Sequence, residues 1–388
     1  MEIPLPARRP LAATLLACAT FALAPIASGA ELDDAKLKQI VDDAVKPVIA
    51  QYAVPGLEVA VTVNGTRHFF DYGLASKAEQ TPVTRDTLFE LGSISKTFTA
   101  TLAAQAVEEE RLSLNDPVTK FMPELKGSAL DRVKVLDLAT HTAGGFPLQI
   151  PDNVTNDKQL IAYYRAWKPQ QPRGTSRVYA NPSVGLLGMV TANAMGGPFE
   201  ALAQDLFHDL GLKRTYITVP QSEMKSYAWG YRDDKPVRVN PAPIANEAYG
   251  VKSNAVDMLR FLEVNMGVGT APGSIQRAVN ATHTGYFQAG GLVQDLIWEQ
   301  YPDLVGLDKL VAGNASEMLK PLPATAIDPP MPPRADVLIN KTGATGGFGA
   351  YVAFLPAKKI GIVMLANRAY PNDARVKAAY AVLSKLAE

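Results

Sequence analysis

The sequence predicts an α+β fold, in which an antiparallel sheet flanked by helices from both chain ends joins a mainly helical lobe. Two observations predict the sheet. Near the N-terminus, strand-like runs at 57–63 and 67–72 flank Asn64-Gly65, a dipeptide typical of two-residue hairpin turns. Near the C-terminus, apolar runs at 336–341, 349–355 and 360–366 have short connections, which favours antiparallel neighbours.

Helices are predicted at both ends of the chain and in its middle. Apolar side chains recur at helical spacing in residues 34–52, and a last helix follows from Asp373. Four further runs predict the helices of the second lobe, namely 133–140, 157–166, 182–194 and 255–266. We therefore expect one sheet lobe built from 31–110 and 301–388, and a mainly helical lobe at 111–300. The proline-rich stretch 321–333 is expected to be a rigid connector.

The first thirty residues are typical of a secretory signal peptide. Arg8 and Arg9 precede an apolar stretch at 11–24, and Ser28-Gly29-Ala30 supplies small residues for cleavage. That stretch is too short to span a membrane. Removing 1–30 leaves 36 basic and 37 acidic residues, a net charge of −1. This balance argues against nucleic acid or an anionic membrane as a partner. From the predicted leader we expect a periplasmic protein, and we further expect a monomer that acts on a small-molecule substrate.

Metal and thiol chemistry are not indicated. Cys18 is the only cysteine and lies inside the predicted leader, so the mature chain has no thiol for catalysis. The four histidines have no metal-ligand spacing; they are His68, His141, His208 and His283. We therefore expect no metal and no cofactor.

Three short motifs occur in an order typical of serine acyl-transfer enzymes: Ser93-Ile94-Ser95-Lys96, Tyr179-Ala180-Asn181 and Lys341-Thr342-Gly343. Each is weak alone, because a serine at a helix start is usually an N-cap and a nearby lysine is usually solvated. Two of them also recur elsewhere, as Ser222/Lys225 and Tyr370/Asn372. Context favours the first set, because an Ala-rich helical run follows Ser93 whereas no such run follows Ser222.

The chemistry needs a base next to the serine. Helical spacing places Lys96 on the same face as Ser93. A serine hydroxyl is a poor nucleophile until a neighbouring group takes its proton, and no Ser-His-Asp arrangement is indicated. The base is therefore Lys96, Tyr179, or the two sharing one proton. The backbone N–H groups of Ser93 and Ala344 are the expected donors to the oxyanion.

Six stretches that include these motifs resemble class C β-lactamases, which are periplasmic serine cephalosporinases. The resemblance covers essentially the whole mature chain, at 89–99, 141–149, 179–183, 247–253, 340–349 and 370–376. It implies the serine β-lactamase/DD-peptidase fold. It also implies hydrolysis of β-lactam antibiotics, with cephalosporins preferred, through a Ser93 acyl-enzyme that confers resistance.

The resemblance also implies a role for each matching residue. Lys96 and Tyr179 would handle protons, and in the absence of a class A Glu-x-x-Leu-Asn segment Tyr179 would also serve deacylation. The implied substrate-binding residues are Gln149 and Asn181 for the side-chain amide, Lys341 and Thr342 for the carboxylate with support from Asn372 and Arg375, Tyr249 as a pocket wall, and Gly343 for close backbone approach. Two positions depart from the family pattern, where Asn340 replaces a common histidine and Ala369 a common polar residue.

Two other functions remain open on the same motifs. A D-Ala-D-Ala carboxypeptidase or a carboxylesterase of this fold would acylate the same serine but release penicillins slowly. A non-enzymatic β-lactam sensor would be acylated once and would need a membrane span or an effector domain, for which no stretch outside 11–24 is apolar enough.

Overall fold

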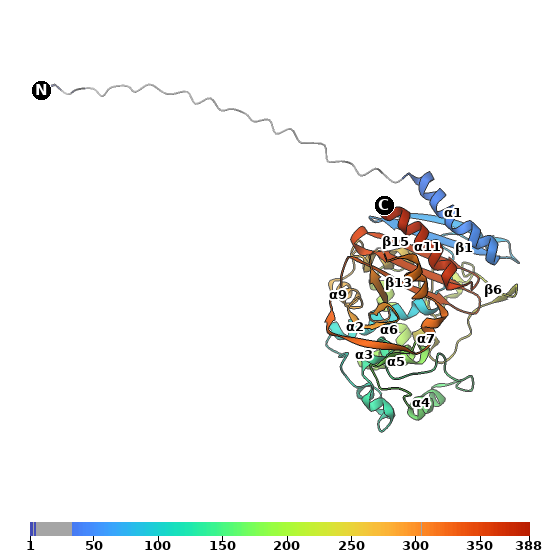
Figure 1. Cartoon of the computed structure of the whole chain (residues 1–388), viewed down its shortest axis with the longest axis vertical. Helices are drawn as coiled ribbons and strands as arrows, with labels where there is room; N and C mark the ends of the chain where they lie inside the picture. The colour runs from blue at the N-terminus through green and yellow to red at the C-terminus, as the bar shows by residue number, and fades with distance from the viewer. Residues whose placement is uncertain (3, 5–32, 304) are drawn as a thin grey trace.

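The computed structural model describes residues 1, 2, 4, 33–303 and 305–388 (Figure 1). The predicted signal peptide, with Cys18, therefore lies outside the described residues except for three positions. Among the helices that are described, none combines the length and the apolar character that a membrane span requires.

The described chain contains an eleven-stranded sheet in which strands from the two ends of the sequence are neighbours. Its order is β3-β2-β1-β15-β14-β13-β11-β10-β9-β12-β5. The strands are β1 (Gly56–Val63), β2 (Thr66–Ser76), β3 (Thr81–Pro82), β5 (Ser176–Arg177), β9 (Gly285–Ala289), β10 (Leu292–Gln294), β11 (Glu299–Pro302), β12 (Leu322–Met331), β13 (Val337–Ala344), β14 (Gly349–Leu355) and β15 (Ile360–Ala366). N-terminal β1 pairs antiparallel with C-terminal β15, from Leu57 opposite Ala366 to Val63 opposite Ile360. The predicted α+β fold with an antiparallel sheet is confirmed.

Helices cover both faces of this sheet. On one face lie α1 (Asp34–Tyr52) and α11 (Asn372–Ala387), which run side by side in Figure 1 and bury one apolar core against the strands. The Asp33 side chain caps α1 by accepting from the Ala35 N–H at 2.9 Å, and the stripe Leu37, Val41 and Val45 is fully buried. Helix α8 (Ala255–Asn265) packs on the other face against β1 and β15.

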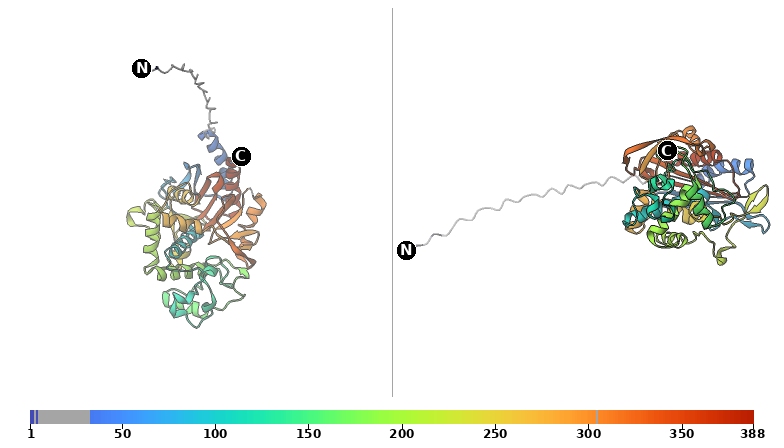
Figure 2. Two further views of the ribbon diagram at one scale, coloured as in Figure 1. Left: turned by 90° about the vertical axis from the view of Figure 1, so that its left-hand side faces the viewer. Right: turned by 90° about the horizontal axis from the view of Figure 1, so that it is seen from below.

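Six further helices of the described chain lie below the sheet in Figure 1, and Figure 2 shows the molecule from two further sides. They are α2 (Ser95–Glu108), α3 (Val135–Ala139), α4 (Asp157–Ala166), α5 (Asn181–Met195), α6 (Phe199–Asp209) and α7 (Ala245–Ala248). Helix α9 (Gly273–Ala281) packs against α2, and α10 (Leu307–Ala312) packs against α11. Helix α2 is buried on nearly every side, which explains its alanines and its lack of a polar face.

The structure differs from two expectations drawn from the sequence. The proline-rich stretch is not a connector, because it forms β12, which pairs with β9 and β5. Its prolines at 329–330 have no N–H to donate to a neighbouring strand. They lie where the ladder with β9 is irregular, between Ala326 and Met331, and a missing donor is tolerated there. The expected lobe boundary at 300 falls inside β11, and β9 and β10 already belong to the sheet before it.

Candidate active site

Ser93 lies in a tight turn, Gly92–Ile94, directly before α2 and against the end of β13. Gly92 has a φ of +53°, and a Cβ added there would lie 2.4 Å from the backbone nitrogen of Ala344. A Cβ on Gly343 would lie 2.0 Å from the Leu91 carbonyl oxygen. Neither position tolerates a side chain, so the backbone of the serine turn and the backbone of β13 are in direct contact.

Lys96 lies beneath the serine, one turn into the helix. Its side chain is completely buried, and Nζ donates to Ser93 Oγ at 3.0 Å and to the Ala248 carbonyl oxygen at 2.7 Å. Burial lowers the pKa of Lys96; nearby Tyr179 opposes this shift and the positive charge of Lys341 adds to it. A lysine with a lowered pKa in contact with a serine hydroxyl can accept its proton.

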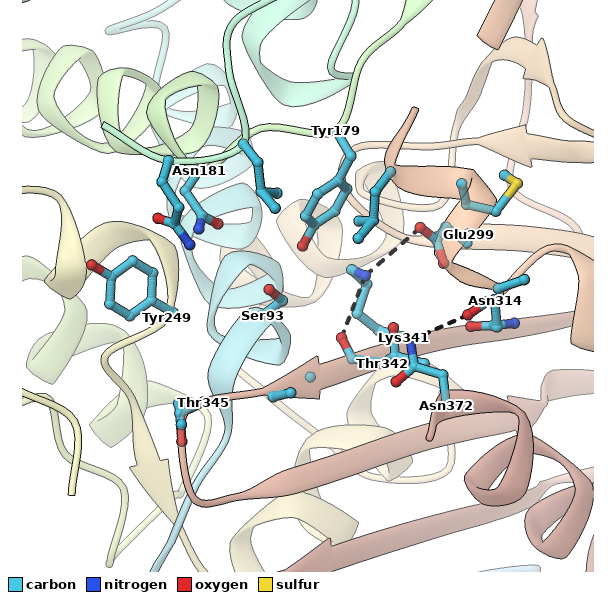
Figure 3. A pocket seen from close by; sticks show the side chains of 18 of the residues that line it. Ser93, Tyr179, Asn181, Tyr249, Glu299, Asn314, Lys341, Thr342, Thr345 and Asn372 are labelled. Atoms are coloured by element: carbon cyan, nitrogen blue, oxygen red, sulfur yellow. Dashed lines mark hydrogen bonds and ion pairs between the residues drawn. The ribbon is translucent and has the colours of Figure 1, made fainter. Parts of the chain in front are cut away.

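Tyr179 follows β5 and precedes α5, and its hydroxyl points to the space between Ser93 and Lys341 (Figure 3). Its ring centroid lies 5.3 Å from Lys96 Nζ and 5.2 Å from Lys341 Nζ. Burial alone would raise the pKa of Tyr179, but Lys341, Lys96 and the interaction with Ser93 outweigh it and lower the pKa. The phenol is therefore easier to ionise than an ordinary tyrosine.

A buried ion network holds the Lys341 amine, and sequence reasoning missed two of its members. Glu299 Oε1 lies 2.7 Å from Arg177 Nη2 and 3.7 Å from Lys341 Nζ. All three side chains are almost fully buried. Arg177 stands two positions before Tyr179, which in an extended segment places both side chains on one face. Glu299 carries no motif that could have identified it.

These residues open on a cavity of about 790 Å³. Ten of the predicted residues line it: Ser93, Gln149, Tyr179, Asn181, Tyr249, Lys341, Thr342, Gly343, Ala344 and Asn372. Figure 3 shows Asn181 and Tyr249 on one side of Ser93, and Glu299, Asn314 and Asn372 on the other. The cavity therefore has two ends with the nucleophile between them.

Two predicted residues do not line the cavity. Lys96 is covered by Ser93. Arg375 is buried behind β13, where its Nη1 donates to the Gly343 carbonyl oxygen at 2.7 Å and its Nη2 donates to the Tyr370 carbonyl. The guanidinium is thus committed to backbone oxygens, and in this arrangement Arg375 supports the strand that carries Lys341 and Thr342 without facing the cavity.

The two departures from the family pattern can also be located. Asn340 is fully buried; its Nδ2 donates to the Glu299 carbonyl oxygen at 3.0 Å, and the Tyr351 hydroxyl donates to its Oδ1 at 3.2 Å. It therefore joins β13 to β11 next to the ion network. Ala369 lies in the loop before α11, and Asn372 at the helix start donates to the Asn314 carbonyl oxygen at 3.2 Å.

Glu90, three residues before the nucleophile, connects three segments, two of which line the cavity through Val239 and Thr345, and it was not predicted from the sequence. Its Oε1 accepts from the Tyr227 hydroxyl at 2.6 Å and from the Val239 N–H at 2.7 Å, while Oε2 accepts from the Thr345 hydroxyl. The carboxylate is 1% exposed. The residue lies on β4 (Phe89–Glu90), which pairs with β8 (Lys252–Ser253).

The remaining candidates for catalysis can be placed in the described part of the chain. His141 packs against Tyr179 with 4.5 Å between ring centroids and the rings tilted by 40°, and its Nδ1 accepts from the Ala180 N–H at 3.4 Å. Burial lowers the pKa of His141 well below its usual value, so the ring is neutral. The duplicate motif at Ser222 and Lys225 is solvent-exposed. No group of three or more acidic, histidine or cysteine side chains suited to a metal occurs among the described residues.

Comparison with known proteins decides the family. The family model for β-lactamases matches residues 41–387. The chain belongs to the β-lactamase family. A curated β-lactamase from Pseudomonas fluorescens is 47% identical over 353 residues, which cover 90% of this chain and 99% of the relative.

Solved structures of family members agree in fold. A class C β-lactamase in complex with cefoxitin is 49% identical, with a TM-score of 0.89 over 91% of this chain and 100% of that one. A structure described as a β-lactamase/D-alanine carboxypeptidase, from Pseudomonas syringae, is 50% identical, with a TM-score of 0.88 over 90% of this chain and 99% of that one. The resemblance of this β-lactamase family member to class C enzymes is confirmed.

Proposed function

We propose that this protein hydrolyses β-lactam antibiotics, with cephalosporins preferred, through an acyl-enzyme on Ser93. The observation that carries the proposal is the 3.0 Å contact between Lys96 Nζ and Ser93 Oγ. It lies at a cavity that Ser93, Tyr179 and Lys341 line together, with Lys341 Nζ 5.2 Å from the centre of the Tyr179 ring. The sequence similarity to a class C β-lactamase solved with cefoxitin supports the same substrate class.

Acylation follows from the geometry around the nucleophile. Ser93 Oγ attacks the β-lactam carbonyl carbon, and its proton passes to the Lys96–Tyr179 pair, whose pKa values are both lowered. The backbone N–H groups of Ser93 and Ala344 stabilise the negative charge on the carbonyl oxygen. The carbon–nitrogen bond then breaks, and the ring nitrogen takes the proton from Tyr179.

Deacylation uses the same groups in the second half of the cycle. A water molecule loses a proton to Tyr179 as its oxygen attacks the acyl carbon. The tetrahedral intermediate collapses, Ser93 Oγ leaves, and the proton returns to it through the Lys96–Tyr179 pair. The positive charge of Lys341 favours the ionised phenol in both steps.

The two ends of the cavity bind different parts of the substrate. Lys341 and Thr342, beside Asn372, bind the carboxylate of the fused ring by donating hydrogen bonds to it. Gln149 and Asn181 hold the side-chain amide at the other end, next to Tyr249. Asn181 supports this assignment, because its Oδ1 is buried with no hydrogen-bond partner in the described chain and can accept the amide N–H of a substrate.

We also propose that the protein acts as a monomer in the periplasm after removal of residues 1–30. Among the described residues, the large apolar side chains that are exposed are Met1, Leu148 and Leu319. The last two line the catalytic cavity, so they give no reason to expect a subunit interface elsewhere.

One experiment tests the function. Purified mature protein is mixed with a chromogenic cephalosporin, and both product formation and the intact mass of the protein are followed. We expect many turnovers by the native protein, none by Ser93→Ala, and native rates for Ser222→Ala, which removes the exposed serine of the duplicate motif. Turnover by Ser93→Ala would overturn the proposal.

A second function has one specific observation in its favour, namely the carboxypeptidase named in the description of the Pseudomonas syringae structure. A D-alanine carboxypeptidase or esterase would give a single burst with the cephalosporin and a persistent adduct on Ser93, together with steady release of D-alanine from a D-Ala-D-Ala peptide. A sensor would give the same adduct and release no D-alanine.

A further inference from the structure

Arg232 brings a positive charge to the end of the cavity that is remote from Lys341. It ends strand β6 (Gly230–Arg232), which pairs with β7 (Lys235–Val237) in a hairpin. Its Nε donates to the Gly346 carbonyl oxygen at 3.1 Å, and a Cβ on Gly346 would lie 2.0 Å from its Nη2. The guanidinium is therefore held against the backbone just beyond the end of β13.

The charge of Arg232 is not neutralised by a nearby acid. Three cations line the cavity, and the other two, Arg177 and Lys341, share Glu299. No carboxylate of the described chain lies within 4.0 Å of the Arg232 guanidinium nitrogens, including that of Asp152, which also lines the cavity.

Two acids follow Arg232 on the same hairpin. Asp233 makes no ion pair within 4.0 Å with the Arg232 guanidinium, and Asp234 is bound to other cations. Asp234 forms ion pairs with Lys77, at 2.9 Å, and with Arg368, at 2.5 Å. Arg232 is also exposed, so its Nη groups are open to solvent and to a ligand in the cavity.

Arg232 lies beside the backbone that follows β13, and this position predicts which part of a bound substrate its side chain would contact. Strand β13 runs from Lys341 to Ala344, beside the nucleophile, at about 3.3 Å per residue, and Thr345 and Gly346 follow directly after its end. A β-lactam with its ring carboxylate at Lys341 and its carbonyl carbon at Ser93 directs its acylamino side chain toward Thr345 and Gly346. Figure 3 shows Thr345 on the same side of Ser93 as Tyr249.

We propose that Arg232 forms a subsite for an anionic group at the outer end of the acyl side chain. The inference rests on the proposed β-lactamase function and narrows its substrate class to β-lactams with a carboxylate in that side chain. The Nη groups of Arg232 donate to this carboxylate, while Lys341 binds the carboxylate of the fused ring.

The test compares two cephalosporins that differ in one group. Both carry the same nucleus, one with an adipoyl and the other with a hexanoyl side chain, so that a terminal carboxylate replaces a methyl group at equal chain length. The measured quantity is the ratio of their kcat/KM values in native protein, Arg232→Gln and Arg232→Lys. We expect Arg232→Gln to lower the adipoyl-to-hexanoyl ratio about threefold, as is typical of an exposed charge pair, and Arg232→Lys to restore part of it.

Two controls separate contact from general effects. Lys235 lies opposite Arg232 in the hairpin but does not line the cavity, so Lys235→Gln removes one positive charge from the same element and should leave the ratio unchanged. A local distortion of the hairpin acts on both substrates and cancels in the ratio. The native ratio should also fall as salt is added, because exposed charges are screened.

The outcomes distinguish the two proposals. If native protein turns over both compounds and Arg232→Gln leaves their ratio unchanged, the subsite is refuted and the β-lactamase function stands. If native protein hydrolyses the chromogenic cephalosporin but neither of these compounds, the subsite is refuted and the β-lactamase function stands. If it hydrolyses none of the three, the proposed function is wrong and the subsite is refuted with it. A ratio that falls equally in Lys235→Gln would attribute the effect to the hairpin's overall charge and would also refute the subsite.

Discussion

The Tyr227 hydroxyl donates a hydrogen bond to the Glu90 carboxylate, with 2.6 Å between the phenolic oxygen and Oε1. Because Glu90 also accepts from the Val239 N–H and the Thr345 hydroxyl, this one carboxylate connects the segment around Tyr227, the end of β13 and the strand that leads to the nucleophile. Glu90 does not line the cavity, yet the width of the end that binds the substrate's acyl side chain depends on it.

We expect Glu90→Gln to weaken this connection, since a neutral amide accepts less strongly and one of its ends is a donor. Hydrogen bonds to charged groups contribute roughly 1.5–3 kcal/mol, so the free energy of unfolding should fall by about that amount. KM should rise most for substrates with large acyl side chains, with kcat less affected. Urea unfolding and kinetics with side chains of increasing size measure the two effects; exposed Glu79→Gln is the control. Equal KM changes for all substrates would contradict the positioning role.

Lys96→Met should remove the group that contacts the Ser93 hydroxyl. General-base assistance contributes about 10²–10⁴ in rate, and we expect kcat/KM to fall by a factor in that range. Lys225→Met, in the exposed duplicate of the motif, is a matched control that should keep native rates. Near-native acylation of Lys96→Met in stopped-flow measurements would exclude this lysine as a proton acceptor.

Tyr179→Phe should slow both halves of the cycle, because the ring remains and only the phenol is lost. We expect kcat to fall by about 10²–10⁴ and the pH dependence of kcat/KM to lose the contribution of an ionising phenol. Tyr370→Phe is the control, since Tyr370 belongs to the second Tyr-x-Asn motif and its buried hydroxyl has no partner in the described chain. A Tyr179→Phe variant with the native pH–rate profile would remove Tyr179 from the mechanism.

Glu299→Gln should change the pH at which activity is lost in acid. The negative charge of Glu299 raises the pKa of Tyr179 and so opposes the larger lowering by Lys341 and Lys96. Its removal lowers that pKa further, and the acid limb of kcat/KM should move to lower pH. A limb that stays in place, or that moves to higher pH, contradicts this account.

The same substitution should also cost stability, because it leaves buried Arg177 without its charged partner. Removing one member of a buried ion pair typically costs about 3–5 kcal/mol, and the retained amide oxygen should keep the loss near the lower value. Thermal unfolding monitored alongside the pH profile separates this effect from the shift in Tyr179.

Glu58 on β1 predicts a pH dependence of stability that is independent of catalysis. The side chain is 1% exposed and lies opposite Asp71 on β2. Burial, with a smaller contribution from Asp71, raises the pKa of Glu58 from 4.5 to about 10. The folded protein therefore holds a proton that the unfolded chain releases above about pH 4.5, and the protonated carboxyl can donate to Asp71.

The sign follows from this proton. The contribution of Glu58 to the free energy of unfolding is fully present below about pH 4.5 and decreases as pH rises toward about 10. Glu58→Gln stays neutral, so it should be more stable than native protein at neutral pH, by an amount on the order of 3 kcal/mol. Urea unfolding at about pH 5 and about pH 9 measures the difference, with exposed Glu124→Gln as control. A difference that does not grow with pH would show that Glu58 is ionised in the folded state.

Local sequence patterns were sufficient for five of the eleven strands of the described sheet, β1, β2, β13, β14 and β15, and for the helices at the two ends of the chain. The Asn64-Gly65 turn fixed the register of β1 and β2, with Val63 opposite Thr66, and the predicted helix at 34–52 coincides with α1. The nucleophile could be chosen between two serines because an apolar helix follows only one of them. Each of these patterns involves residues that are close together in the chain, so one sequence is enough to recognise it.

Other features depend on contacts between distant segments and could not be predicted. Glu299 reaches Lys341 across neighbouring strands, and Glu90 reaches Thr345 across 255 positions of sequence. Strand β12 was not predicted because of its prolines. Whether a proline disrupts a strand depends on whether the neighbouring strand needs its missing N–H, and the sequence does not identify that neighbour. Arg375 was expected at the substrate, but its guanidinium is bound to carbonyl oxygens behind β13.

The pairing of β1 with β15 has a consequence for biosynthesis. A ribosome completes the first hairpin early, yet the edge of β1 that will face β15 has no neighbour until nearly the entire polypeptide has emerged. An isolated two-stranded ribbon is marginally stable, so the hairpin cannot hold its native geometry alone. The pairing of β1 with β15 is therefore delayed until the last segment of the chain has been synthesised. A chain that stops shortly before residue 360 lacks β15, so the sheet that supports the nucleophile cannot form.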